Sequence, residues 1–415
     1  MLVLDVPDFL SPEWGNVVPF ALPEEEKKVY QKDGFNYTVY FDPGPPPSCF
    51  GESAPYFKWG FSLVSLWGSH LDPTDGVMID ISPATMGNIT RYPESIEQYD
   101  QFYDLLEGKD GSQGYARNPK TGKPYEKQIV PRGDYSRILA EFWADGPDSE
   151  TPPGHWFVIL NTVMDHPEFK RKFKGVGPEL SELEYDIKAY FTLGGAMHDS
   201  AITAWALKGY YDYIRPVSAI RAMAQLGQST SRKLPNYHEE GIPLMPGYIE
   251  MVEENDPLDN DGENRHKIKL YTWRGPDHIR NPRLDVVGVG WILAENWWPY
   301  QRPTFVQPPF AAYVSGHSTF SRAGAEVLTL LTGDAYFPGG MSDFSCTKDD
   351  FLVFETGPSV DLKLQWATYY DAADQCSLSR IWGGIHPPQD DIPGRYIGKK
   401  IGPMAFDFAN RHFHP

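Results

Sequence analysis

The chain has 415 residues, of which 41% are hydrophobic and 14% aromatic, so it is long enough to bury a large core. Its formal net charge of −19 opposes binding to nucleic acid or to anionic membrane surfaces, because both contacts depend on Lys and Arg. The three cysteines lack the C-x-x-C spacing of zinc or thioredoxin-like sites, although Cys346 and Cys376 are a candidate disulfide pair.

The N-terminal third is predicted to be irregular. Residues 1–10 (MLVLDVPDFL) contain no basic segment, so we do not expect a signal peptide. Proline and glycine interrupt residues 11–60, where the stretch NYTVY is typical of a short strand. Short helical pieces follow, as in residues 93–108. We expect residues 1–134 to form a strap with short helices that packs on the body.

Helices are predicted to dominate residues 135–415. No apolar run approaches the ~18 residues of a membrane-spanning helix. Residues 227–283 are interpreted as a polar loop region with one short helix at 247–255. We therefore predict a mainly α fold, in which one large helical-bundle domain carries long loops and little strand. Apolar residues at helical spacing indicate helices within 135–146, 155–164, 179–216, 323–333, 362–380 and 391–411.

The first candidate site segment runs from Lys208 to Arg215, with Trp205 just before it. Lys208 and Arg215 are predicted to lie on one helix face, two turns apart. Pro216 is expected to end or kink this helix. Apolar and aromatic neighbours indicate that the segment is buried, and a buried cation needs an anionic partner. The alternative is a solvated face on which Asp212 pairs with Lys208.

The second segment, residues 311–324 (AAYVSGHSTFSRAG), places small polar residues directly before a predicted helix. Ser315 and Gly316 would present a hydroxyl and a backbone N–H at the helix N-terminus, where anions bind readily. His317 adds a group that titrates near neutral pH. The alternative is an ordinary helix cap formed by Ser315.

The third segment runs from Ser379 to Asp390. Arg380 offers a two-pronged guanidinium for an oxyanion. His386 follows six residues later, and Asp390 is expected to accept its second ring N–H and so fix its tautomer. The alternative is a loop salt bridge from Arg380 to Asp390 or Asp391. Together the three segments predict a cationic cage for a tetrahedral or trigonal-bipyramidal oxyanion.

The motif order K-x6-R-P, S-G-H and S-R-x5-H-x3-D, from Lys208 to Asp390, resembles the three-part signature of the phosphatidic acid phosphatase type 2 superfamily. That superfamily contains acid phosphatases, lipid phosphatases and vanadium-dependent haloperoxidases. The wide spacing of the motifs, and Trp205 three residues before Lys208, resemble the bacterial haloperoxidase branch. Phe310, five residues before the motif serine, resembles it too. Val314 departs from the pattern, in which proline usually precedes S-G-H.

The resemblance implies a vanadium-dependent haloperoxidase that oxidises halide, foremost iodide or bromide, with hydrogen peroxide to hypohalous acid. His386 would bind vanadium in vanadate and later in a peroxovanadate, and Asp390 would orient His386. His317 would act as acid and base, and Lys208 would polarise the peroxide. Phosphate would occupy the site when vanadium is absent. The residues implied to hold the cofactor are Lys208, Arg215, Ser315, Gly316, His317, Arg380 and His386.

Several neighbouring residues have weaker candidate roles. Trp205, Phe310 and His198 are candidates for lining the substrate pocket, and Asp199 is a candidate partner for a motif arginine. The acidic loop 256–264 lacks the spacing of an EF-hand, which favours a solvated loop over a calcium site.

Two other functions stay open from the sequence. One is an acid phosphatase in which His386 forms a phosphohistidine and His317 protonates the leaving group. The other is a catalytically inactive oxyanion-binding protein. The expected partners are hydrogen peroxide, halide and an organic acceptor, with no nucleic acid and no membrane span, while homo-oligomerisation is left open. By resemblance the protein would be soluble, and secreted or periplasmic.

Overall fold

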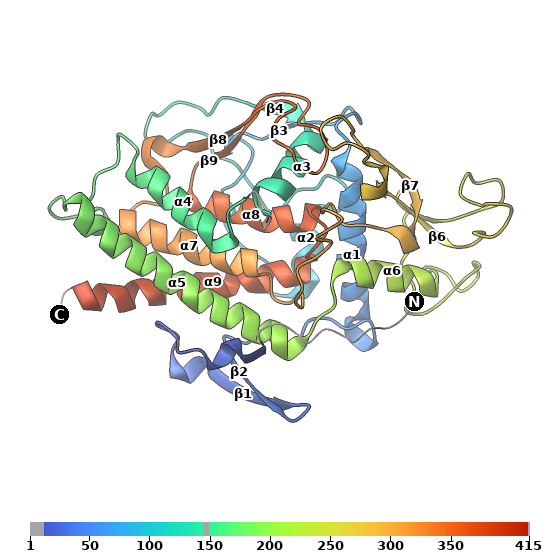
Figure 1. Cartoon of the computed structure of the whole chain (residues 1–415), viewed down its shortest axis with the longest axis horizontal. Coiled ribbons are helices and arrows are strands. Elements are labelled where there is room, and N and C mark those ends of the chain that lie inside the picture. Colours follow the sequence, from blue (N-terminus) through green and yellow to red (C-terminus); the bar gives the residue numbers. More distant parts are fainter. Residues whose placement is uncertain (1–11, 145–148, 414–415) are drawn as a thin grey trace.

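The computed structural model of the protein describes residues 12–144 and 149–413, and the fold is mainly α, as predicted (Figure 1). The N-terminal stretch for which no signal peptide is expected, residues 1–10, lies outside the described residues. The helices are α1 (Ala54–Trp67), α2 (Tyr99–Phe102), α3 (Arg132–Phe142), α4 (Pro152–Met164), α5 (Glu182–Tyr211), α6 (Pro216–Leu226), α7 (Gly316–Thr332), α8 (Tyr369–Trp382) and α9 (Pro388–Phe413).

Helix α7 is the centre of the bundle. It packs against α5, α8 and α9, and α4 covers a further side (Figure 1). The hydroxyl of Ser315 caps its N-terminus by accepting a hydrogen bond from the backbone N–H of Ser318 at 3.3 Å. Gly333 ends it in the left-handed conformation, with φ of 72°. The S-G-H motif is therefore buried inside the bundle.

Glycines at every fourth position let α9 lie close against α7. A Cβ on Gly394 would lie 2.8 Å from the carbonyl oxygen of Ser315, and one on Gly398 would lie 2.4 Å from that of Thr319. A Cβ on Gly402 would also overlap α7. This spacing of four residues places the three glycines on one face of α9. The close approach fixes the first turn of α9 beside the N-terminus of α7.

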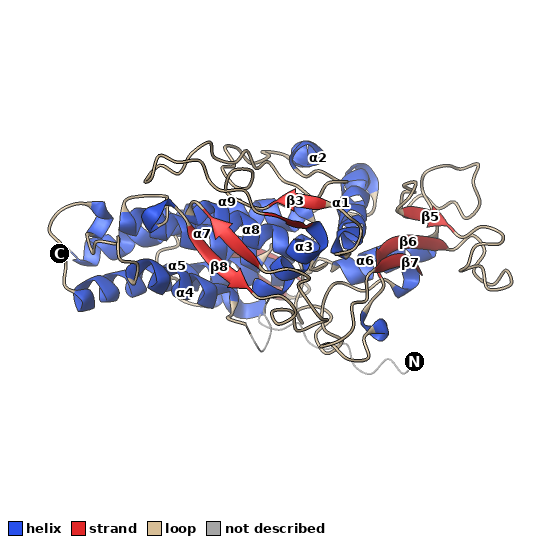
Figure 2. Cartoon of the chain, turned by 90° about the horizontal axis from the view of Figure 1, so that it is seen from above, coloured by secondary structure: helices blue, strands red, loops and turns tan. Residues whose placement is uncertain are grey.

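The strands form small antiparallel sheets around the bundle (Figure 2). The helix expected at 247–255 is wrong, because Ile249 pairs with Leu270 in a three-stranded sheet and this pairing overrides local helix propensity. The strand expected at NYTVY is confirmed as part of β2. The sheets are β1 (Lys27–Lys32) with β2 (Phe35–Tyr40), β3 (Met78–Asp80) with β4 (Ile129–Pro131), β5 (Ile249–Met251) with β6 (Ile268–Trp273) and β7 (Val289–Leu293), and β8 (Ser342–Cys346) with β9 (Leu362–Trp366).

Tyrosine hydroxyls hold the N-terminal strap on the bundle. Tyr213 donates to the carbonyl of Pro47 at 2.8 Å, and Tyr313 donates to that of Gly44 at 2.9 Å. One continuous apolar core contains side chains from both the strap and the bundle. Helix α3 runs across residue 134, where the boundary between the strap and the helical core is expected. That boundary stays a prediction.

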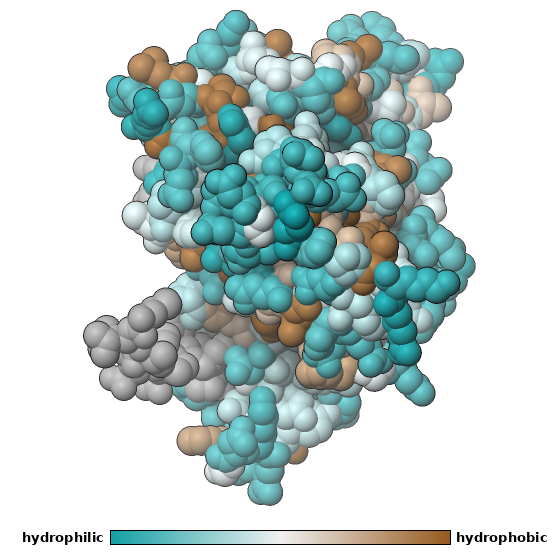
Figure 3. All heavy atoms as spheres, turned by 90° about the vertical axis from the view of Figure 1, so that its right-hand side faces the viewer, coloured by the Kyte–Doolittle hydropathy of each residue, from teal (hydrophilic) through white to brown (hydrophobic). Residues whose placement is uncertain are grey.

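The remaining expectations concern the thiols, the acidic loop and the surface. Cys346 and Cys376 are both buried free thiols, so the candidate disulfide is not formed. Most residues of loop 256–264 are exposed or partly exposed, in agreement with a solvated loop, although Asp256 and Asp259 form ion pairs with Lys269 and Arg265. No helix within the described ranges is long and apolar enough to cross a membrane. The face on the side of β6 and β7 is mainly hydrophilic (Figure 3).

The substitution Gly398→Ala should lower the free energy of unfolding by about 1–3 kcal/mol, because the new methyl group would push α9 away from α7. Denaturant unfolding followed by circular dichroism measures the change. Gly194→Ala is the matched control in α5, since its Cβ would meet nothing nearer than Phe157 at 4.0 Å. We expect the control to be neutral or stabilising by up to ~1 kcal/mol. Equal losses in both variants would contradict the close packing.

Candidate active site

The three predicted segments meet at the N-terminus of α7. The side chains of Lys208, Arg215 and Arg380 are buried, with exposed fractions of 0%, 4% and 1%. Arg215 Nη1 lies 3.1 Å from Nε2 of His386, and Arg380 Nη1 lies 3.3 Å from Nε2 of His317. The structure therefore brings the cations and histidines of all three motifs into one cage.

Lys208 and Arg215 do not share a helix face, and that prediction is wrong. Helix α5 ends at Tyr211 because Asp212 adopts the left-handed conformation, with φ of 46°. Arg215 lies beyond this break, in extended conformation at the start of α6. The two cations still meet, because both donate to the carbonyl of Ala311, Lys208 from Nζ at 3.0 Å and Arg215 from Nη2 at 3.2 Å. Lys208 therefore donates to a backbone carbonyl, and the alternative in which it pairs with Asp212 on a solvated face is wrong.

The C-terminal end of α3 holds the second pair of cage residues. The carbonyl of Trp143 accepts a hydrogen bond from Nη1 of Arg380 at 2.5 Å and lies 2.9 Å from Nε2 of His317. Arg380 also donates from Nη2 to the carbonyl of Ala140 at 3.3 Å. The last carbonyls of a helix lack partners within the helix and carry partial negative charge, so they suit a guanidinium. A carbonyl gives no residue-type pattern, so sequence analysis did not find Trp143.

Asp390 orients His386 in the way that was predicted. Nδ1 of His386 lies 2.8 Å from Oδ2 of Asp390, so the two side chains share a hydrogen bond, and with the proton on Nδ1 the carboxylate accepts it. Nε2 then keeps its lone pair and faces Arg215. The backbone N–H of Ser315 donates to the carbonyl of Asp390 at 2.9 Å, which joins two motifs through the main chain.

The cage contains several basic side chains whose burial shifts their pKa values. Burial, and then the charge of Arg215, lower the pKa of Lys208 well below its ordinary value. Burial also lowers the pKa of Arg215 to about 9 and that of His386 well below its usual range. Burial raises the pKa of Asp390 to about 8, although Lys208 and Arg215 act against this. An anion in the cage would favour the charged forms of Lys208 and Arg215, so these donors fit an oxyanion.

The pKa of His317 does not lie near neutral pH, where the sequence had led us to expect it. Burial, and then the charge of Arg380, lower its pKa well below the ordinary value. Because the carbonyl of Trp143 can only accept a hydrogen bond, Nε2 of His317 is assigned the proton and Nδ1 the lone pair. The imidazole is neutral in the protein alone, and a bound anion would raise its pKa.

Two aromatic rings cover the cage beside Lys208. Its Nζ lies 5.3 Å from the ring centre of Phe310 and 5.8 Å from that of Trp205, within the range of a cation–π contact. Both rings are half-buried, and their centres are 5.0 Å apart. A Cβ on Gly316 would lie only 3.1 Å from Trp205. The predicted pocket residues Trp205 and Phe310 therefore lie at the rim of the cage.

His198 and Asp199 do not join the cage. His198 is exposed, and its Nε2 lies 2.9 Å from the carbonyl of Val18. Asp199 is buried but accepts backbone N–H groups of Phe20 and Ala21 at 2.7 and 2.8 Å. Both side chains hold the N-terminal segment. The pocket role predicted for His198 and the arginine partner predicted for Asp199 are wrong.

A buried ion pair that sequence analysis missed supports the cage from behind. Asp391 accepts hydrogen bonds from Nε and Nη2 of Arg395 at 2.9 and 2.7 Å. It also accepts one from the hydroxyl of Ser318 at 2.7 Å, and that hydroxyl lies 3.0 Å from the hydroxyl of Ser315. These contacts place Asp391 behind the anion-binding segment and oppose the alternative in which it pairs with Arg380. The spacing of four residues between Asp391 and Arg395 on a helix was the available sequence pattern.

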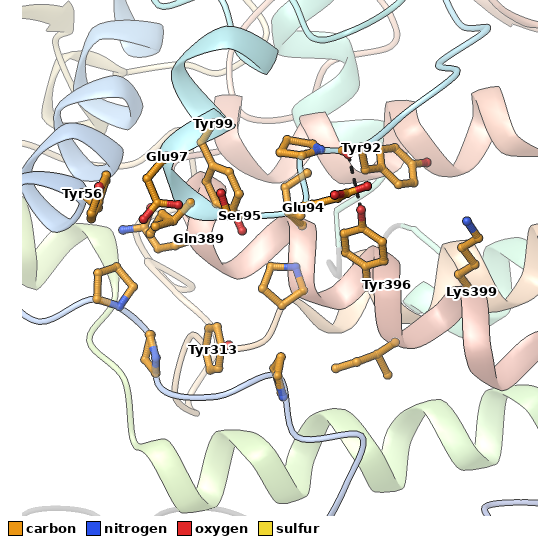
Figure 4. A pocket seen from close by; sticks show the side chains of 18 of the residues that line it. Tyr56, Tyr92, Glu94, Ser95, Glu97, Tyr99, Tyr313, Gln389, Tyr396 and Lys399 are labelled. Carbon is orange, nitrogen blue, oxygen red and sulfur yellow. Dashed lines mark hydrogen bonds between the residues drawn. The ribbon is translucent and has the colours of Figure 1, made fainter. Parts of the chain in front are cut away.

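A large cavity lies on another side of the motif segments. Its volume is about 1100 Å³, and tyrosines and prolines dominate its wall (Figure 4). Tyr313 and Gln389 line it, each next to or near a motif residue in sequence. The predicted cage residues do not appear in its wall. This cavity is therefore separate from the cage.

The chain matches the family model described as the VCPO second helical-bundle domain over residues 188–415, a range that contains all three motifs. A comparison with curated proteins finds no match. Among solved structures, the chain is similar to a bacterial vanadium-dependent chloroperoxidase in its apo form, with 18% identity and a TM-score of 0.47 over 67% of this chain and 45% of that chain. The holo form of such a chloroperoxidase has 18% identity to this chain and a TM-score of 0.45, over 68% of this chain and 45% of that chain.

A bacterial vanadium-dependent iodoperoxidase gives 17% identity and a TM-score of 0.45, over 97% of this chain and 58% of that chain. The chain thus spans about half the length of the solved chains that it matches.

Replacing Asp391 by Asn should lower the free energy of unfolding by about 1.5–3 kcal/mol, because Arg395 would lose one of its two buried carboxylate partners and keep Asp374. Glu184→Gln is the matched control, since Glu184 forms an ion pair of the same i,i+4 spacing with Lys188 at the surface. Glu184→Gln should lower the free energy of unfolding by no more than ~1 kcal/mol. Calorimetric unfolding of both variants measures the difference, and a similar small loss in each would show that the buried pair contributes little.

Proposed function

The chain belongs to the family of the VCPO second helical-bundle domain, and on this premise we propose that it is a vanadium-dependent haloperoxidase. The proposed reaction oxidises halide with hydrogen peroxide to hypohalous acid, with iodide and bromide as the foremost substrates. Iodide is the halide most easily oxidised. The observation that supports the proposal is geometric: the buried side chains of Lys208, Arg215 and Arg380 meet the two motif histidines in one cage.

Vanadate suits the donors of this cage. His386 would bind the metal through Nε2, which keeps its lone pair because Asp390 accepts the proton of Nδ1. The bound vanadate would supply a Lewis acid that activates peroxide. The oxygens would be held by charge-assisted hydrogen bonds and by the helix N-terminus, through Lys208, Arg215, Arg380, Ser315 and Gly316.

His317 is the proposed acid and base. Its Nε2–H donates to the carbonyl of Trp143, which leaves Nδ1 to accept a proton from hydrogen peroxide as it enters the cage. The same nitrogen would return that proton to the oxygen that departs. The charge of an anion in the cage would raise the pKa of His317 toward the range in which both transfers are efficient.

Lys208 and the two aromatic rings would select the halide. Lys208 attracts an anion and would polarise the peroxide through its ammonium group. Trp205 and Phe310 cover this cation with half-buried rings, which keep water away from it. A weakly hydrated halide such as iodide would enter such a rim with the lowest desolvation cost.

The direct test compares two activities of the same protein. Metal-free protein is assayed with a chromogenic phosphate ester, and then reconstituted with orthovanadate and assayed for triiodide formation from iodide and peroxide. We expect triiodide formation that depends on vanadate. Strong phosphatase turnover without vanadate-dependent oxidation would instead support a phosphatase in which His386 attacks phosphorus. Binding of vanadate or phosphate with neither activity would support the catalytically inactive oxyanion-binding protein.

Two histidine variants separate cofactor binding from proton transfer. His386→Ala should weaken vanadate binding by more than the ~10–100-fold that loss of an outer partner causes. His317→Ala should keep vanadate bound and lose about 10²–10⁴-fold in halide oxidation. Isothermal titration and triiodide formation measure the two quantities. His198→Ala, an exposed histidine outside the cage, is the control and should change neither. Loss of vanadate binding in a folded His317→Ala protein would contradict the role given to His317.

A further inference from the structure

A second, smaller cavity lies between the C-terminal end of α3, α4 and the β8–β9 hairpin. Its volume is about 280 Å³, close to the lower end of the ~300–1,000 Å³ found for small-molecule sites. Its size therefore suits a ligand of one or two rings. Apolar side chains form most of its wall, among them Phe142, Val158, Ile159, Phe344, Phe351 and Trp366.

The aromatic rings of this cavity form a connected wall that is partly open to solvent. The ring centres of Phe142 and Phe344 are 4.7 Å apart, and those of Phe344 and Phe351 are 6.0 Å apart. Three of the large apolar side chains in the wall are unusually exposed, with 41% for Phe344, 46% for Val158 and 45% for Val353. Exposed apolar side chains gathered around one hollow are typical of a binding site.

The cavity is separated from the cage by one residue of the main chain. Phe142 and Ala144 line the cavity on either side of Trp143 in sequence. The carbonyl of Trp143 contacts Arg380 and His317 on the cage side. The cavity and the cage therefore lie on either side of the main chain at Trp143.

His155 gives the cavity a polar group. It is 3% exposed, lines the cavity, and lies with its ring centre 5.0 Å from that of Trp143. Its Nδ1 is 3.6 Å from a carboxylate oxygen of Glu150, while its buried Nε2 has no hydrogen-bond partner in the part of the chain that the structure describes. Burial lowers the pKa of His155 to about 4, so the ring is neutral near neutral pH and has an unused nitrogen to offer.

We propose that this cavity binds the organic halogen acceptor, an uncharged, electron-rich aromatic molecule of one or two rings such as a phenol or an indole. His155 would hydrogen-bond the hydroxyl or ring N–H, and the apolar wall would hold the ring. The inference rests on the proposed function, which supplies hypohalous acid. Charged side chains also line this cavity, namely Glu141, Glu150, Arg302 and Asp343, as they do the larger cavity of Figure 4, but the smaller volume matches one or two rings more closely.

The chemistry of the transfer requires an electron-rich acceptor. A ring carbon attacks the halogen of hypohalous acid, so a carbon–halogen bond forms and the halogen–oxygen bond breaks. The ring then loses its proton, which combines with the departing hydroxide to give water. Carbon is oxidised and the halogen is reduced, so no further oxidant or reductant is needed.

The test measures probe binding and halide oxidation separately. Binding of 5-fluoroindole to the full chain is followed by fluorine NMR in the wild type, in Val158→Trp, which fills the cavity, and in Leu183→Trp. Leu183 is also exposed on a helix but lies outside the cavity, so it is the matched control. We expect saturable binding, weakened at least about tenfold by Val158→Trp and changed less than about twofold by Leu183→Trp.

Triiodide formation with vanadate and without an organic acceptor reports the proposed function alone, and it should be unchanged in Val158→Trp. If triiodide forms but the wild type does not bind the probe, or Val158→Trp binds it equally well, the acceptor site is wrong and the haloperoxidase stands. If the wild type forms no triiodide with vanadate, the haloperoxidase is wrong and the acceptor role falls with it.

A second variant tests the polar contact and does not depend on filling the cavity. His155→Phe keeps a ring against Trp143 but removes both ring nitrogens. It should weaken binding of 4-fluorophenol and leave binding of 4-fluorotoluene unchanged, because only the phenol has a hydroxyl for His155. Equal effects on the two probes, measured by fluorine NMR, would contradict the role of His155.

Discussion

The burial of Lys208, Arg215 and Arg380 around two histidines is the constraint on which this structure depends. Lys208, Arg215 and Arg380 are held mainly by backbone carbonyls, including those of Ala311 and Trp143. Carbonyls orient the cations but carry no full negative charge. Burying a cation costs several kcal/mol, and a bound anion would offset part of that cost. We therefore propose the cage as an oxyanion site, from its buried basic side chains as well as from its motif residues.

The bundle supplies the rigidity that such a site needs. Helix α7 brings its N-terminus to the centre, and the glycines of α9 allow the helix that carries Asp390 to approach it closely. The Asp391–Arg395 pair ties the same turn of α9 to Ser318 and so to the hydroxyl of Ser315. These contacts come from segments far apart in sequence. Small shifts of α9 would consequently move the histidine and the anion-binding turn together.

Residue type and order in the sequence were enough to predict most side chains of the site. The main-chain geometry around those side chains could not be predicted from the sequence. The motif residues meet as expected because their residue types and their order are visible in the sequence. The shared helix face of Lys208 and Arg215 was wrong, since a single left-handed residue, Asp212, ends α5 early. The role of the Trp143 carbonyl could not be predicted from the sequence, because every residue has a backbone carbonyl. The strand at Ile249 was missed because its partner lies outside the local sequence.

The most direct test of the central claim is calorimetric unfolding of the metal-free protein at increasing concentrations of orthovanadate. A ligand that binds only the folded state at one site adds about 2.7 kcal/mol of stability at a concentration of 100 times its Kd. The account predicts that the unfolding temperature rises steadily with vanadate and follows this one-site relation. An unfolding temperature that vanadate leaves unchanged would contradict a cage built to receive an oxyanion.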